Sequence, residues 1–381
     1  MLLISLTEFI LYISFSVLIG SLILLMVPEN KKPPIYVPKK VLCLAAGLIP
    51  IAAFLPVFQT AYILAGDMDR WLFIKSVVFT FEIGKAWLFI TFISVILICV
   101  LLAKNLETNK KLTIWAIFLT LLMLLGYGRS SHAATITEWQ GFVFHTLHFL
   151  AVTVWIGILL VISWFSKNKN NWLNFLKWFT PIAITCLIIT IVAGYFTMEI
   201  DIDSYDDPNA SVIQEYQNSL IVNYGQALVL KHIFIISLVL FAFINGVMFR
   251  RRYNQESFNP LKWARLESVY ALIVFGLTAF MGQSWPPHQI YLLINTEGAS
   301  PLFETLYSGD IVNTIQNAEN FEVFNVIISF GMDSYLLFGL AILFMILTIF
   351  AAIIRKSVFV STFSSLLMVV SIYFGIMFGV Q

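Results

Sequence analysis

The chain has 381 residues, of which 60% are hydrophobic and only 11% charged, a composition that excludes an ordinary soluble globular protein. The apolar residues form runs of about 20 or more, the length that a helix needs to cross a bilayer. Such runs are too long and too uniformly apolar for barrel strands. The expected fold class is therefore all-α, a polytopic transmembrane helix bundle, and we take residues 1–381 as a single integral membrane domain.

The hydropathy pattern predicts about ten spans along the chain. Before the third span, the stretch 67–83 mixes aromatic and charged side chains, which is typical of a helix that lies along the membrane surface. A long loop at 285–332 follows the eighth span and is apolar enough to fold back over the membrane face. An alternative to ten full spans is that the ninth span does not cross the membrane fully, because Asp333 lies at its start. The predicted spans are 3–27, 41–65, 84–103, 112–128, 138–164, 177–198, 225–249, 266–284, 333–354 and 357–379.

The basic residues predict the orientation of these spans. With an extracytoplasmic N-terminus, 17 of the 22 Lys and Arg residues fall in the cytoplasmic connections, among them Arg250, Arg251, Arg252 and Lys356. On the same assignment, 17 of the 21 Asp and Glu residues fall on the other side or in the outer membrane halves. Both termini and the loop 285–332 are then extracytoplasmic. Because topology and anionic lipid explain the basic loops, no nucleic acid partner is expected.

All five histidines fall on or near the predicted outer face. His132 follows the fourth span, His145 and His148 lie in the outer half of the fifth, His232 lies in the outer third of the seventh, and His288 follows the eighth. Imidazole is a common metal ligand, and polar groups inside membranes mark functional sites by default. The one-sided placement therefore suggests a metal site that opens to the outside.

The start of the fifth span suggests how two of these histidines are placed. The sequence TITE at 135–138 has the form of a capping box, with Thr135 as N-cap and Glu138 three residues later. On a helix that starts there, His145 and His148 are neighbours on one face. His148 would lie roughly 10 Å below the surface, where a polar ring needs a partner. That partner is a carbonyl or hydroxyl of a neighbouring helix in one interpretation and a metal ion in the other.

Methionine adds a softer donor near the outer ends of the spans. Met281 lies within the eighth span, just before GQSWPP and seven residues before His288. A thioether beside imidazole favours Cu(I) among common biological metals, although methionine is also an ordinary apolar filler. The candidate metal ligands are His132, His145, His148, His232, Met281 and His288.

Charged residues in or beside the outer half-spans need counter-charges. Lys231 lies next to His232, and we expect it to reach the surface or to pair with an outer acid such as Glu138 or Asp333. Arg129 is a similar case, and the acids Glu8 and Glu82 are candidate counter-charges. The acidic stretch DIDSYDD at 201–207 either raises the local cation concentration or is simply a solvated loop.

Several short motifs resemble one family. The segment HTLHFLAVTVWIG places His148, Ala151, Trp155 and Gly157 on the H-x-x-A-x-x-x-W-x-G signature of the copper resistance protein D family. The resemblance runs from about 80 to 290, while the first two and the last two spans match only in being apolar. The other matching segments, in order, are EIGKAW at 82–87, SHA at 131–133, YGQALVLKH at 224–232 and ARLESVYALIVFGLTAFMGQSWPP at 264–287.

This resemblance implies a protein of the bacterial inner (plasma) membrane that handles copper, often by uptake beside or fused to a periplasmic copper-binding domain. No such domain lies within these 381 residues, so an extracytoplasmic copper-donor protein is an expected partner, besides the lipid bilayer and the copper ion. The resemblance implies copper transport through a His/Met site in the outer half of the bundle, with Cu(I) and Cu(II) both open. We expect a transporter or metal-binding protein and no enzyme, since no catalytic motif is found.

Two other functions remain open at this point. In the first, the chain is a b-type haem protein that transfers electrons, with His145 or His148 facing His232 as axial ligands. The absence of any histidine on the cytoplasmic side counts against a second haem there. In the second, the chain is a non-metal transporter whose histidines are simply hydrogen-bonded.

Overall fold

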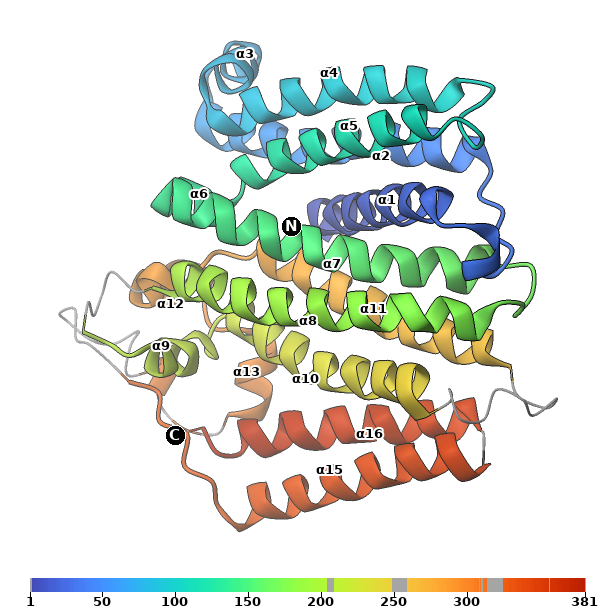
Figure 1. Cartoon of the computed structure of the whole chain (residues 1–381). Coiled ribbons are helices and arrows are strands. Elements are labelled where there is room, and N and C mark those ends of the chain that lie inside the picture. Colours follow the sequence, from blue (N-terminus) through green and yellow to red (C-terminus); the bar gives the residue numbers. More distant parts are fainter. Residues whose placement is uncertain are drawn as a thin grey trace. The chain divides into compact units, whose positions relative to one another are not determined.

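The computed structural model describes residues 2–203, 209–248, 259–307, 309, 311–313, 325–355 and 357–380 (Figure 1). Ten of its helices are long and apolar enough to cross a membrane, and no strand occurs in these ranges, which confirms the all-α class and the predicted spans. The ninth of them runs from Met332 to Ile354, long enough to cross fully. Arg250, Arg251, Arg252, Glu256, Lys356 and most of the stretch 201–207 lie outside the described residues.

The chain divides into two compact units, which we describe separately. The N-terminal unit contains Leu2–Ile200 and Asn259–Ser268, and the C-terminal unit contains Asp201–Phe258 and Val269–Gln381. The helices up to the first boundary are α1 Leu2–Met26, α2 Lys39–Ala65, α3 Arg70–Thr80, α4 Glu82–Leu102, α5 Lys110–Arg129, α6 His132–Thr137, α7 Trp139–Phe165 and α8 Trp172–Ile202. The later ones are α9 Val212–Ser219, α10 Asn223–Phe243, α11 Pro260–Gly282, η4 Pro287–Gln289, α12 Ile290–Glu297, α13 Pro301–Leu306, α15 Met332–Phe350 and α16 Val358–Met377.

In the N-terminal unit, α1 packs against α2, α5 and α7. Small residues bring the α1 and α7 backbones close together. A Cβ atom added to Gly20 would lie 2.2 Å from the backbone carbonyl of Gly157, and one added to Gly157 would lie 2.3 Å from the carbonyl oxygen of Ser16. Close approach through small residues is a common way to pack membrane helices. The structure thus supplies a packing reason for Gly157 in the family-like signature.

The connection between α5 and α7 differs from the sequence prediction. Ser131 is the N-cap of α6, and its side chain accepts a hydrogen bond from the Ala134 N–H. Thr135 lies inside α6, where its hydroxyl donates to the carbonyl of His132. Glu138, at φ 45°, then separates α6 from α7. The predicted capping box is therefore wrong, because a short extra helix takes up the residues that were expected to start the fifth span.

The segment 67–83 is helical as predicted. Asp69 caps α3 by accepting from the Trp71 N–H at 2.9 Å. Val77 and Val78 are buried in a cluster with residues of α2 and α4, whereas Trp71 and Phe79 are exposed. This division into a buried and an exposed apolar face suits the predicted position at a membrane surface.

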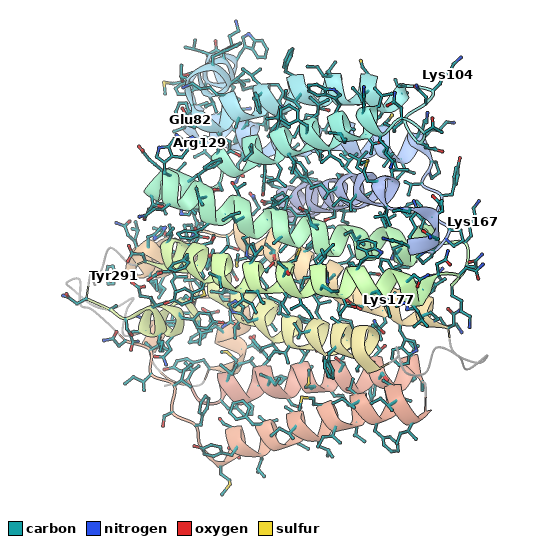
Figure 2. The ribbon with its side chains drawn as sticks, in the orientation of Figure 1. Glu82, Lys104, Arg129, Lys167, Lys177 and Tyr291 are labelled. Atoms are coloured by element: carbon teal, nitrogen blue, oxygen red, sulfur yellow. The ribbon has the colours of Figure 1, made fainter. Side chains whose placement is uncertain are left out.

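Charges separate along the N-terminal unit. Glu82 pairs with Lys85 at 3.2 Å and with Arg129 at 3.7 Å, which confirms Glu82 as a counter-charge. Figure 2 shows Glu82 and Arg129 at one end of the helices, with Lys104 and Lys167 at the other. Lys104 and Lys167, both assigned to cytoplasmic connections, therefore share one end of this unit.

In the C-terminal unit, α15 and α16 pack together and α16 also contacts α10. The described part of the loop after α11 folds back on the unit, since Phe303 of α13 is fully buried and Ser300 N–H donates to the Ile221 carbonyl at 2.7 Å. Asn218 of α9 accepts from the Val326 N–H at 2.8 Å. These contacts hold together the end of the unit where His232, His288 and Asp201 lie.

Candidate functional site

His145 lies in the second turn of α7 and points toward α5. Its ring centroid is 5.9 Å from that of Tyr127 and 6.5 Å from that of Phe149. Its Nε2 atom is buried and has no hydrogen-bond partner. Among the imidazole nitrogens of the described residues, it is the only one in this condition. A buried nitrogen without a partner is costly, so this atom is a candidate ligand for a group that the protein itself does not supply.

A carboxylate contacts Tyr127, the tyrosine that packs against the His145 ring. Glu8 Oε1 accepts from the phenols of Tyr12 and Tyr127, each at 2.8 Å, and the two phenol oxygens lie 3.4 Å apart. Tyr127 thus touches both the carboxylate and the imidazole. We call Glu8, Tyr12, Tyr127 and His145 the Glu8 cluster. Two phenol donors stabilise the ionised carboxylate, and a carboxylate and an imidazole nitrogen without a partner are both groups that bind cations.

Sequence reasoning named Glu8 only as a counter-charge and missed both tyrosines. The spacing of Glu8 and Tyr12 offered a signal, because residues four apart on a helix are neighbours. Nothing in the sequence showed that Tyr127 of α5 would join them. That contact depends on the packing of α1 against α5 and of α5 against α7.

His148 turns away from the Glu8 cluster and toward α8. Its Nδ1 lies 3.0 Å from the carbonyl oxygen of Thr190. Gly194, one turn further along α8, leaves room for the ring, since a Cβ there would lie 2.8 Å from His148 Nδ1. In this structure His145 contacts Tyr127 of α5 and His148 contacts Thr190 of α8. Residues three apart are about 60° apart around the axis, and here that angle sends the rings to different helices.

His132 is the first residue of α6, directly after its N-cap Ser131. The described side chains form no group of three or more His, Cys, Asp or Glu placed to hold a metal ion. His132, His145 and His148 therefore do not make one ready ligand set.

In the C-terminal unit, His232 pairs with a phenol. Its Nδ1 lies 3.0 Å from the Tyr216 hydroxyl, and the two rings stack with centroids 5.8 Å apart. Burial raises the pKa of the Tyr216 phenol well above its usual range, so the hydroxyl keeps its proton. Both residues border a cavity of about 320 Å³ whose other lining residues are apolar, including Ile328 and Ile376. This pocket suits an apolar group better than a bare ion.

His288 is buried in η4, where its Nδ1 lies 2.5 Å from the carbonyl oxygen of Asp203. A backbone carbonyl on one ring nitrogen is the usual way to orient an imidazole whose other nitrogen binds a metal, and it is equally common in purely structural histidines. The contact ties η4 to the segment that leaves α8. It brings His288 to the same end of the unit as Asp201.

Lys231 and Met281 meet at this end. Lys231 Nζ lies 3.6 Å from Met281 Sδ and is attracted electrostatically by Asp201. The sequence suggested Glu138 and Asp333 as examples of acids that Lys231 could pair with, and it did not single out Asp201. The stretch that starts at Asp201 was expected either to raise the local cation concentration or to form a solvated loop, but α8 continues to Ile202, four residues beyond the predicted end, and includes Asp201. Its Oδ2 accepts from the Tyr224 hydroxyl at 3.4 Å.

Comparison with known proteins identifies one family. Residues 1–142 match the model described as copper resistance protein D-like, N-terminal domain. No curated protein and no solved structure matches the chain. The match agrees with the family that the motifs indicated but covers a different stretch, since it includes the first two spans and ends before His145. The predicted core at 80–290 overlaps it only over 80–142.

Proposed function

Since residues 1–142 match the copper resistance protein D-like, N-terminal domain and ten helices are long and apolar enough to cross a membrane, we propose that the chain is a copper-handling membrane protein that binds copper between its helices and moves the ion across the membrane. Copper is the cargo here. We place binding at the Glu8 cluster, with His145 as ligand and the Glu8 carboxylate as the charge that offsets the ion. The observation that carries this assignment is the buried Nε2 of His145, which has no partner in the described structure.

The physical argument rests on two costs that a copper ion would remove. Leaving a buried polar atom unpaired costs about 1–3 kcal/mol, which a metal–nitrogen bond offsets. A carboxylate in the low-dielectric interior is also stabilised by a nearby cation. Because Tyr127 and Phe149 pack against the His145 ring, the ligand is held in place before the ion arrives.

The other predicted ligands keep a role as proposals. His132 and His148 are candidate copper ligands in the N-terminal unit. The Thr190 carbonyl contacts the His148 ring, as a backbone carbonyl often does with a ligating imidazole. His232, Met281 and His288 belong to the C-terminal unit and are candidates for a second part of the path. We further propose that copper comes from the extracytoplasmic side of a bacterial plasma membrane, delivered by a donor protein.

The test is copper binding by the protein purified without chelator. We expect bound copper in the wild type, with one equivalent lost in His145→Ala and in the His145→Ala/His148→Ala double variant. Reconstituted vesicles should accumulate copper with the wild type and less with His145→Ala. A double variant that binds copper with wild-type stoichiometry and affinity would rule out this site.

The same sample separates the two alternatives. A Soret absorption band would indicate the haem protein, with His145 or His148 as an axial ligand. A metal-free preparation whose thermal stability does not respond to added copper would indicate a non-metal transporter. Bound copper without a Soret band is the outcome that we expect.

A further inference from the structure

A second polar cluster lies in the C-terminal unit, around the end of α8. Lys231 of α10 places its ammonium 3.6 Å from the thioether of Met281, at the end of α11. Tyr224, seven residues before Lys231 on α10, donates to Asp201 Oδ2 at 3.4 Å. We call Asp201, Tyr224, Lys231 and Met281 the Lys231 cluster.

The carboxylate in this cluster is incompletely paired. Asp201 Oδ1 is buried and has no hydrogen-bond partner among the described residues. Asp201 and Lys231 attract each other electrostatically, but no ion pair within 4.0 Å joins them. A purely structural pair in a low-dielectric site would be expected to close to direct contact, because each unmade charged hydrogen bond is costly. A buried carboxylate oxygen therefore remains open to another cation.

The Lys231 ammonium lies beside the Met281 thioether, which is the softest metal ligand in this cluster. A thioether is a weak hydrogen-bond acceptor but a good ligand for Cu(I). The carboxylate and the ammonium together carry no net charge, so a copper ion added beside them would leave an uncompensated positive charge. The ion and the ammonium therefore compete for the same position.

We propose that Asp201 and Met281 are ligands of a Cu(I) site in the C-terminal unit, and that the Lys231 side chain occupies this site until the metal displaces it. This inference rests on the proposed copper function and adds a second site with a built-in competitor. Lys231 acts as a tethered cation that weakens binding and favours release. The copper ion stays Cu(I) throughout, and no bond other than metal–ligand bonds is formed or broken.

The competing explanation is a lysine that extends its side chain toward the membrane surface and stabilises the fold. The two explanations differ in the effect of removing the charge. A tethered competitor predicts tighter copper binding in Lys231→Gln, on the order of tenfold to a hundredfold for unit charges several ångströms apart at an effective dielectric constant near 20. A structural lysine predicts lower thermal stability and no gain in affinity.

The experiment is a Cu(I) titration of the full chain in detergent against a chromophoric Cu(I) chelator. We expect Met281→Leu and Asp201→Asn each to remove one copper equivalent that His145→Ala leaves in place. Lys231→Gln should tighten that equivalent, and Lys231→Arg should keep it weak. Met332→Leu, at the exposed start of α15, is the matched control and should bind as the wild type does.

Thermal unfolding of each variant accompanies the titration. Met281→Leu nearly conserves side-chain volume and should unfold close to the wild-type temperature, so it tests the site even where a charge variant does not fold. Full copper stoichiometry in both Met281→Leu and Asp201→Asn, or unchanged affinity in a folded Lys231→Gln, would overturn the inference. Those results leave the proposed function intact if His145→Ala still loses copper. A wild type that binds no copper removes the proposed function itself.

Discussion

The two polar clusters differ in what stands beside the carboxylate. In the N-terminal unit, Glu8 Oε1 is held by two phenols, and the unpaired atom is an imidazole nitrogen. In the C-terminal unit, the carboxylate of Asp201 is under the electrostatic influence of the Lys231 ammonium, and the unpaired atom is a carboxylate oxygen. The four residues that define the first cluster include no lysine or arginine, whereas the second cluster contains Lys231.

This difference bears on how a membrane protein handles a metal ion. A site that only binds holds its ion, because the interior strengthens each electrostatic contact. A side-chain cation that can return to the site lowers the affinity and allows the ion to leave. Opposite effects of charge removal are therefore expected in the two clusters.

The largest effect should come from the helix packing that forms the Glu8 cluster. In Gly157→Ala, the new Cβ would lie 2.3 Å from the Ser16 carbonyl oxygen, so α1 and α7 must separate. We expect a loss of about 3 kcal/mol in the free energy of unfolding, at the upper end for overpacked sites, with weaker copper binding at His145. Thermal unfolding and copper titration measure both. Gly276→Ala is the control, since nothing lies within 4 Å of its added Cβ, and equal stability of the two variants would contradict the prediction.

Charge removal at Glu8 should have the next largest effect. Glu8→Gln keeps an oxygen acceptor for Tyr12 and Tyr127, so the fold should persist. Loss of the negative charge should weaken copper binding at His145 by about tenfold or more, opposite in sign to Lys231→Gln. The measurement is a competitive copper titration, with Tyr12→Phe as a control that removes one donor and no charge. Wild-type affinity in Glu8→Gln would show that the carboxylate does not face the ion.

The smallest effect on stability and copper binding is expected for His148, the histidine that lies on the family-like signature. His148→Ala removes the contact between the ring and the Thr190 carbonyl, which should cost about 1 kcal/mol of stability. Copper binding at the Glu8 cluster should stay within about twofold of the wild type, well under the tenfold that 1.4 kcal/mol represents. Thermal unfolding and copper titration of His148→Ala beside His145→Ala provide the comparison. If His148→Ala loses copper while His145→Ala keeps it, then His148 is the ligand.

The sequence predicted the helices better than their ends. Runs of about 20 apolar residues leave little choice other than a spanning helix, so the number of spans was predictable. The capping box at Thr135 failed because Ser131, four residues earlier, caps a separate short helix. The end of the sixth span was placed too early, since the helix continues through Glu199 and Asp201. A span predicted from hydropathy ends at the first charged residues, whereas the hydrogen-bonded helix can continue through them.

The candidate sites were less predictable than the spans, because a partner on another helix is set by packing. The sequence by itself determined the all-α class, the ten apolar helices and the presence of imidazole, carboxylate, ammonium and thioether groups in or beside them. Only the tertiary structure decided that His145 joins Glu8 through Tyr127, that His148 turns to α8, and that Lys231 contacts Met281 within electrostatic reach of Asp201. The physical reason is that hydropathy is a local property of a segment. The neighbour of a polar side chain depends on which helices approach one another, and at α1 and α7 that approach depends on the missing side chains of Gly20 and Gly157.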